Sequence, residues 1–167
     1  RSCLMEIVIS DTNIFIDLWN IGLLERFCEL PVSIHTTDFI IGELKTQGVK
    51  DAIAQLHQEG KITIKTFKSN EYAEIMLLQD KNLSFQDCTV LYYALNGDYK
   101  LLTGDRNLRV IAERHGLQVS GIIYVIDELL HHDILSKEEY ITKLKALLES
   151  NHRLPTKEIM KRIEDFL

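Results

Sequence analysis

The chain has few cysteines and no recognisable cysteine or histidine metal site. Its 167 residues include three cysteines, Cys3, Cys28 and Cys88, which lie far apart in the sequence. Three dispersed thiols cannot build a disulfide scaffold, and they lack the paired spacing of a zinc site. The six histidines show no metal-ligand spacing either. The sequence therefore excludes the disulfide-rich and zinc-cluster classes, and we expect reduced thiols in a cytoplasmic protein.

Long apolar segments are also absent. No stretch has the length and apolar character of a membrane span, and no secretory signal pattern opens the chain. The composition, 46% hydrophobic and 26% charged, is typical of a globular protein with a core. A chain of this length suits one domain. We expect no membrane partner.

Basic residues are in the minority. The chain has 19 Lys and Arg against 25 Asp and Glu, which gives a formal net charge of −6. Proteins that coat nucleic acid need clustered Lys and Arg to neutralise phosphates, so this balance argues against that class. There is no phosphate-binding glycine loop. An enzyme whose acidic pocket binds divalent cations remains compatible with the charge.

The sequence does contain an alternation of apolar strands and amphipathic helices. Strands are predicted at 6–10, 32–35, 62–67, 99–103 and 118–126. Helices are predicted at 14–21, 23–30, 38–44, 51–59, 69–78, 84–95 and 107–115. Strands that alternate with helices in this way predict an α/β fold with a mostly parallel central sheet.

The pattern changes to helix alone after residue 126. Helical segments are predicted at 127–132, 137–149 and 156–166. Their apolar stripe must pack on another surface; it consists of Ile141, Leu144, Leu147, Leu148, Ile159, Ile163 and Phe166. We therefore predict a domain over residues 1–126 and a helical extension over 127–167, which packs on the same domain or on a dimer partner.

Four acidic residues occupy matching places in these elements. Asp11 and Asp105 directly follow predicted strands, and Asp87 lies in the first turn of the helix that Ser84 caps. Glu43 is predicted within the helix that follows the second strand. The carboxyl ends of parallel strands share one edge, where ligands bind in open α/β sheets. Each residue also has a structural explanation, since Asp is a common helix cap and Ser84-x-x-Asp87 is a capping box.

The local sequences around these acids resemble a known family. The matching segments are IVISDTNIFIDL at 7–18, IIGELK at 40–45, LSFQDCTVLYYAL at 83–95 and LLTGDRNLRVIAERHG at 101–116. Together they resemble the PIN domain, the metal-dependent nuclease fold of VapC-type toxins and related ribonucleases. The resemblance covers about residues 6–126. It implies a three-layer α/β/α sandwich, hydrolysis of RNA, and an antitoxin protein and a homodimer as candidate partners.

The resemblance also implies roles for individual residues. Asp11, Glu43, Asp87 and Asp105 match the family's catalytic, metal-binding acids, and Asn13 and Thr103 resemble its supporting polar residues. Independently of the family, carboxylates about 5 Å apart repel by roughly 3 kcal/mol per pair at an effective dielectric near 20. Oxygen-only ligands favour Mg²⁺ or Mn²⁺, and two such ions can activate water for an in-line displacement at phosphorus.

Substrate contacts are less well marked. Arg106, Arg109 and Lys45 lie close in sequence to the acids, and we predict phosphate contacts for Arg106 and Lys45 in particular. Surface solvation is the alternative for each of them. Two other functions remain open, a PIN-fold module that binds RNA or protein without cutting it, and another Mg²⁺-dependent phosphoryl-transfer domain. The latter normally has Asp-x-Asp after its first strand, where this chain has Asn13.

Overall fold

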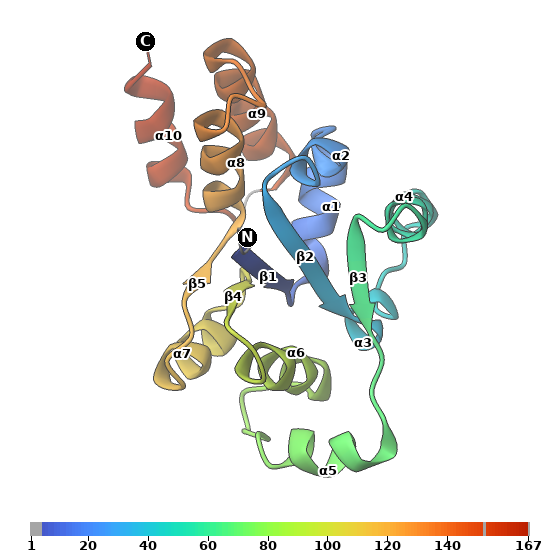
Figure 1. Cartoon of the computed structure of the whole chain (residues 1–167). Helices are drawn as coiled ribbons and strands as arrows, with labels where there is room; N and C mark the ends of the chain where they lie inside the picture. Colours follow the sequence, from blue (N-terminus) through green and yellow to red (C-terminus); the bar gives the residue numbers. More distant parts are fainter. Residues whose placement is uncertain (1–4, 152, 167) are drawn as a thin grey trace.

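A five-stranded parallel sheet forms the centre of the molecule (Figure 1). The computed structural model describes residues 5–151 and 153–166. The strands are β1 Met5–Ile9, β2 Val32–Thr37, β3 Ile62–Lys65, β4 Tyr99–Leu102 and β5 Val119–Ser120. Their order across the sheet is β3-β2-β1-β4-β5, and each described pair is parallel. The predicted α/β fold is confirmed.

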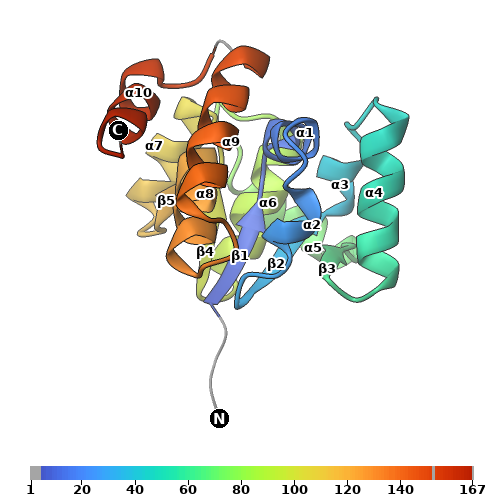
Figure 2. The same ribbon diagram turned by 90° about the horizontal axis from the view of Figure 1, so that it is seen from above.

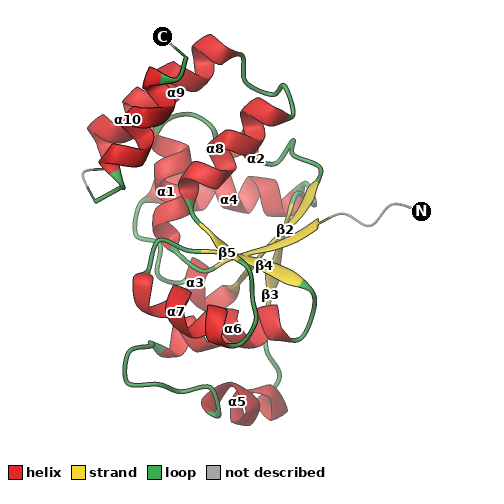
Figure 3. Ribbon diagram, turned by 90° about the vertical axis from the view of Figure 1, so that its left-hand side faces the viewer, coloured by secondary structure: helices red, strands yellow, loops and turns green. Residues whose placement is uncertain are grey.

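Helices cover both faces of this sheet (Figure 3). On one face lie α1 Thr12–Asn20, α2 Leu24–Phe27, α4 Gln47–Gln58, α8 Ile122–His131, α9 Lys137–Ser150 and α10 Thr156–Glu164. On the other face lie α3 Asp38–Ile41, α5 Ser69–Met76, α6 Phe85–Leu95 and α7 Arg106–Arg114. The result is a three-layer arrangement with one apolar core on each side of the sheet.

Alternation along the strands divides their side chains between the two cores. In β1, Ile7 and Ile9 enter one core and Val8 enters the other. In β4, Leu102 enters the same core as Ile7 and Ile9, and Leu101 enters the same core as Val8. Successive side chains of a strand point to opposite faces, so a strand buried on both faces is apolar throughout. This is why these strands are recognisable in the sequence as short continuous apolar runs.

The predicted strand over residues 118–126 is wrong. Only Val119 and Ser120 pair with β4, and the apolar run that follows Gly121 is helix α8. Five of the ten residues of α8 are buried, so its sequence is apolar on most of its circumference. Hydrophobic periodicity alone cannot separate a short buried helix from a buried strand.

The predicted helix over residues 38–44 is also too long. Helix α3 ends at Ile41, and Gly42 and Glu43 form a turn after it. Helix α4 then begins at Gln47, four residues before the predicted start at Asp51. The predicted capping box of α6 is present, because Ser84 Oγ accepts a hydrogen bond from Asp87 N and Asp87 Oδ2 accepts one from Ser84 N, each at 3.0 Å.

Two of the C-terminal helices, α8 and α9, pack against α2 and α1, and α10 packs on α9. Figure 2 shows α8 and α9 beside α1 and α2, in agreement with the contacts of α2 with α8 and of α1 with α9. The buried residues of α9 and α10 belong to the same core as those of α1 and α2; they are Tyr140, Leu144, Leu147, Ile159 and Ile163. These helices therefore complete one face of the central sheet.

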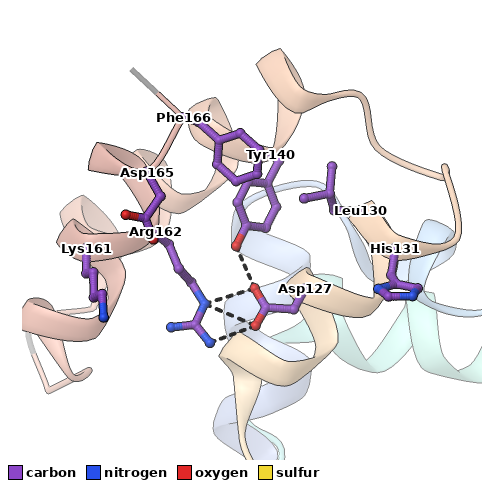
Figure 4. A pocket seen from close by; sticks show the side chains of 8 residues that line it. All are labelled: Asp127, Leu130, His131, Tyr140, Lys161, Arg162, Asp165 and Phe166. Carbon is purple, nitrogen blue, oxygen red and sulfur yellow. Dashed lines mark hydrogen bonds and ion pairs between the residues drawn. The ribbon is translucent and has the colours of Figure 1, made fainter.

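A polar network ties the three C-terminal helices together (Figure 4). Arg162 of α10 donates to both carboxylate oxygens of Asp127 in α8 at 2.8–3.0 Å. Tyr140 of α9 donates its hydroxyl proton to Asp127 Oδ1 at 2.5 Å. A bidentate arginine–carboxylate pair fixes orientation as well as distance. This network therefore joins α10 and α9 to α8 through one carboxylate.

Among the described residues, no helix is long and apolar enough to cross a membrane.

Truncation of Leu144 tests whether α9 is part of the core. Leu144 is fully buried, so we expect Leu144→Ala to lower the free energy of unfolding by about 2–5 kcal/mol. The neighbouring exposed residue provides a control, since Lys145→Ala should change this value by less than about 0.5 kcal/mol. Urea unfolding measures both. A loss below about 1 kcal/mol for Leu144→Ala would mean that α9 does not pack on the rest of the chain.

Candidate metal centre

The sheet creates a crevice where its strand order changes direction. β1 has β2 on one side and β4 on the other, and the helices that follow β1 and β4 cover opposite faces. In open α/β sheets such a switch point is the usual ligand site. Here the two strand ends are joined directly, because Ser10 N and Ser10 Oγ both donate to Leu102 O at 3.0 Å.

Asp11 and Asp105 lie on the two sides of this crevice. Asp11 caps α1 by accepting from Asn13 N at 2.9 Å, and its other oxygen accepts from Gly104 N at 3.2 Å. Asp105 caps α7, because its Oδ1 accepts from the backbone N–H groups of the second and third helical residues at 2.8 and 3.1 Å. Both residues therefore act as the helix caps that the sequence suggested. Capping holds each carboxylate at the end of its strand.

Asp87 reaches the same crevice because α6 is fixed to the end of β2. Thr89 Oγ1 lies 3.1 Å from Thr37 Oγ1, and both residues are fully buried. Thr37 also caps α3 by accepting from Ile40 N at 3.3 Å. Thr37 thus positions the starts of both α3 and α6. Asp87 lies in the first turn of α6, two residues before Thr89.

Glu43 approaches from the turn after α3 rather than from a helix. Its backbone N donates to Ile40 O at 3.1 Å, which tightens the turn. The next residue, Leu44, is 2% exposed and anchors the chain in the core. Glu43 itself is exposed.

The four predicted acids come together in one pocket of about 360 Å³. Its lining residues are Ser10, Asp11, Thr12, Asn13, Glu43, Ser84, Asp87, Thr103 and Asp105. Both predicted supporting residues are therefore at the site. Thr103 is 1% exposed, and its Oγ1 accepts from Asp105 N at 3.0 Å, which orients the turn that carries the acid.

The pocket concentrates negative charge. Within the described part of the chain, no Lys, Arg or His forms an ion pair with any of the four acids. Burial raises the pKa of Asp87, and the charges of Asp105 and Asp11 add to this, while its hydrogen bonds with Ser84 act in the opposite direction. Although Glu43 is exposed as a residue, partial desolvation of its carboxyl group raises its pKa, with further contributions from the charges of Asp87 and Asp11.

The donors present fit an open site for a hard divalent cation. Among the described residues, Asp87 Oδ1, Asp105 Oδ2 and both Glu43 oxygens accept no hydrogen bond, so they are available as ligands. As positioned, no three acidic, histidine or cysteine side chains among these residues converge closely enough to enclose an ion by themselves. Mg²⁺ usually takes only one or two carboxylates and completes its shell with water and substrate phosphate. The donor set fits that arrangement and not a closed cage.

The two predicted phosphate contacts lie outside this pocket. Arg106 is the first residue of α7 and is exposed, and Lys45 is exposed in the loop before α4. Neither residue lines the pocket. Their contact with substrate remains a prediction.

Asp17 is a buried acid next to the site that the sequence analysis missed. It is 6% exposed and lies one helical turn after Asn13 in α1. Asn151 donates to Asp17 Oδ2 at 3.0 Å. Burial raises the pKa of Asp17, the hydrogen bond from Asn151 lowers it, and the charge of Asp11 raises it. The available signal was an aspartate within the otherwise apolar run of α1.

The family of the chain follows from its sequence. The profile of the family described as DUF3368, a PIN domain, matches residues 7–166. The chain belongs to this PIN domain family. The match extends through the C-terminal helices as well as the sheet.

Two solved structures match the chain at low sequence identity. A PilT N-terminus domain protein from the hyperthermophilic archaeon Sulfolobus solfataricus P2 has 15% identity and a TM-score of 0.44, over 75% of this chain and 94% of that one. VapBC2 from Rickettsia felis, solved bound to a DNA fragment from its promoter, has 16% identity and a TM-score of 0.46, over 70% and 98%. A comparison with curated protein sequences finds no match.

Removal of the Asp17 charge tests the electrostatics of this edge. The raised pKa means that folded Asp17 binds a proton more tightly than unfolded Asp17, so the free energy of unfolding falls as pH rises above the ordinary value of 3.8. Asp17→Asn keeps an oxygen that can accept from Asn151. In EDTA it should therefore melt at a higher temperature than wild type at pH 7, and the difference should shrink as pH approaches 3.8.

Thermal melting between pH 4 and 7 measures this difference. Asp98→Asn serves as the control, because Asp98 is exposed. A variant that is less stable than wild type at every pH would show that the Asp17 charge contributes stability.

Proposed function

We propose that the chain is a metal-dependent endoribonuclease that hydrolyses RNA phosphodiester bonds with Mg²⁺ or Mn²⁺. Members of the PIN domain family are typically metal-dependent nucleases, and the family match supports the class. The observation that most supports activity in this chain is the pocket itself. Four carboxylates from four separate chain segments line it, without a cationic partner among the described residues. Nothing in the fold requires all four acids at one point.

Water is the nucleophile that this pocket favours. The lining residues include no histidine, cysteine or lysine. The hydroxyl of Ser10 donates to Leu102 O, and that of Ser84 accepts from Asp87 N, so both are used in structural hydrogen bonds. Bound divalent ions would supply the Lewis acidity that lowers the pKa of water and stabilises the leaving oxygen. A covalent protein intermediate is not needed.

The acids of the pocket have distinguishable tasks in this mechanism. Asp11 is held at both oxygens by backbone N–H groups, so its orientation is fixed before any ion binds. Asp87 and Asp105 line the pocket, and each uses one oxygen for hydrogen bonds at a helix start and has a second oxygen that accepts no hydrogen bond among the described residues. Glu43 is the exposed member, in the turn after α3, and completes the acidic wall. A phosphate diester would be repelled by this cluster unless cations neutralise it.

An antitoxin partner and a homodimer stay predictions of the resemblance. The toxin-like role likewise stays a prediction of the resemblance. The boundary between residues 126 and 127, inferred from the change of sequence pattern, also stays a prediction.

Metal binding is tested by melting the protein with increasing Mn²⁺. We expect the wild type to gain stability with Mn²⁺, because a ligand that binds only the folded state stabilises it. Asp87→Asn and Asp105→Asn preserve an oxygen for the caps and should lose at least about tenfold in metal affinity. Asp98→Asn, on an exposed turn, should respond as wild type. Equal stabilisation of all four proteins would place the metal elsewhere.

Cleavage is tested with the same proteins and a labelled single-stranded RNA. With Mn²⁺, wild type and Asp98→Asn should cut the RNA, and Asp87→Asn and Asp105→Asn should be slower by on the order of 100-fold. Addition of EDTA should stop the reaction. Metal binding by wild type without cleavage of single-stranded or structured RNA would instead support a non-cleaving RNA- or protein-binding module.

A further inference from the structure

A second groove adjoins the acidic pocket and is walled by the C-terminal helices. Its volume is about 530 Å³, within the range of about 300–1,000 Å³ that is usual for ligand pockets. Thr103 and Gly104 line its inner end, and Glu158 and Arg162 of α10 line its outer end. Gly104 N is hydrogen-bonded to Asp11, so the groove begins at the strand end where the acidic pocket lies.

Three arginines from separate elements line this groove. They are Arg109 of α7, Arg153 of the connection between α9 and α10, and Arg162 of α10. Arg162 is already neutralised, since it pairs with Asp127 (Figure 4) and, at 3.1 Å, with Glu158. Those two acids are also the ones that line the groove. The arginine and the acids of this outer end therefore offer little net charge to a ligand.

Arg109 and Arg153 are different. In the described ranges 5–151 and 153–166, neither forms an ion pair. Arg109 Nη1 donates to Val119 O at 3.3 Å, which holds its guanidinium beside β5 and leaves other N–H groups free. Arg153 lines both this groove and the small cavity that contains Asp11 and Asp17. The two cations therefore face the same path from the acidic pocket.

Among the residues that line the groove, the acids are Asp127 and Glu158, and both are paired with Arg162. Gly121, the cap of α8, has no side chain to accept from the first N–H groups of the helix, and Gly121 to Ile123 line the groove. The N–H groups at a helix start that no side chain caps add a favourable potential for anions. A guanidinium offers several donors in a plane and suits phosphate oxygens.

We propose that this groove, here called the arginine groove, binds backbone phosphates of the RNA strand that flank the scissile phosphate, with Arg109 and Arg153 as the phosphate contacts. The inference rests on the proposed function, because it takes the acidic pocket as the place of cleavage. A strand that leaves this pocket along the groove meets repulsion from the acids of the pocket and attraction from these two arginines, which form no ion pair among the described residues. The C-terminal helices thereby supply part of the substrate site.

The salt dependence of RNA binding tests this proposal. Binding of a short fluorescein-labelled single-stranded RNA of mixed sequence is measured by fluorescence anisotropy in EDTA at several KCl concentrations. Each phosphate contact on a single strand contributes about 0.7 to the slope of log K against log salt. Arg109→Gln and Arg153→Gln should each reduce the slope by about 0.7, and the double variant by roughly 1.4.

Arg114→Gln is the matched control. Arg114 is exposed, lies in the same helix as Arg109 and does not line the groove. For Arg114→Gln, the slope of log K against log salt should equal that of wild type. Thermal melting establishes that each variant is folded, which matters for Arg109 because its hydrogen bond to Val119 is lost or altered.

The outcomes for the groove and for cleavage are separable. No measurable binding by wild type, unchanged slopes for both groove variants, or an equal change for Arg114→Gln would overturn the arginine groove. If wild type cuts RNA with Mn²⁺ but the groove variants bind and cut like wild type, the nuclease proposal stands and the groove fails. If the slopes change as expected and wild type does not cut, the groove stands as an RNA-binding surface and the nuclease proposal fails.

Discussion

The hydrogen bonds that cap three helices also hold the acidic cluster together. Asp11, Asp87 and Asp105 each accept backbone N–H groups at a helix start, and like charges at this edge would otherwise separate. A cap contributes about 0.5–2 kcal/mol to stability, so it offsets part of the repulsion. The structural and the functional explanation of these residues are therefore not alternatives. The bond that makes each aspartate a cap is also what places its remaining oxygens.

This arrangement explains which features were predictable from sequence. Asp11 and Asp105 follow strands, and Ser84 and Asp87 form a local capping motif, so neighbouring residues alone define their places. Glu43 is predicted in a helix but lies in the turn after α3, because the local pattern does not show that α3 ends at Ile41 and that Leu44 is buried in the core. The run after Gly121 was assigned to a strand because burial on most sides makes α8 uniformly apolar.

Other parts of the site depend on contacts between distant segments, and no local pattern predicts them. The hydrogen bond that Asp17 accepts comes from Asn151, 134 residues later in the chain. The same connection brings Arg153 beside the strand ends. Thr37 and Thr89, 52 residues apart, fix the start of α6 through buried hydroxyl groups. These contacts depend on the order of the strands and on how the C-terminal helices pack. Both are properties of the whole fold that no short segment of the sequence determines.

The net charge of −6 does not exclude an RNA substrate. Surface charges are screened over a Debye length of about 8 Å at physiological salt, so a bound strand responds to the groups beside it rather than to the total. In this chain the acids at the outer end of the arginine groove are neutralised by Arg162, whereas Arg109 and Arg153 have no ion-pair partner among the described residues. Under the proposed function, cations would neutralise the acidic pocket before phosphate enters it. Local pairing, rather than composition, therefore decides where a polyanion can bind.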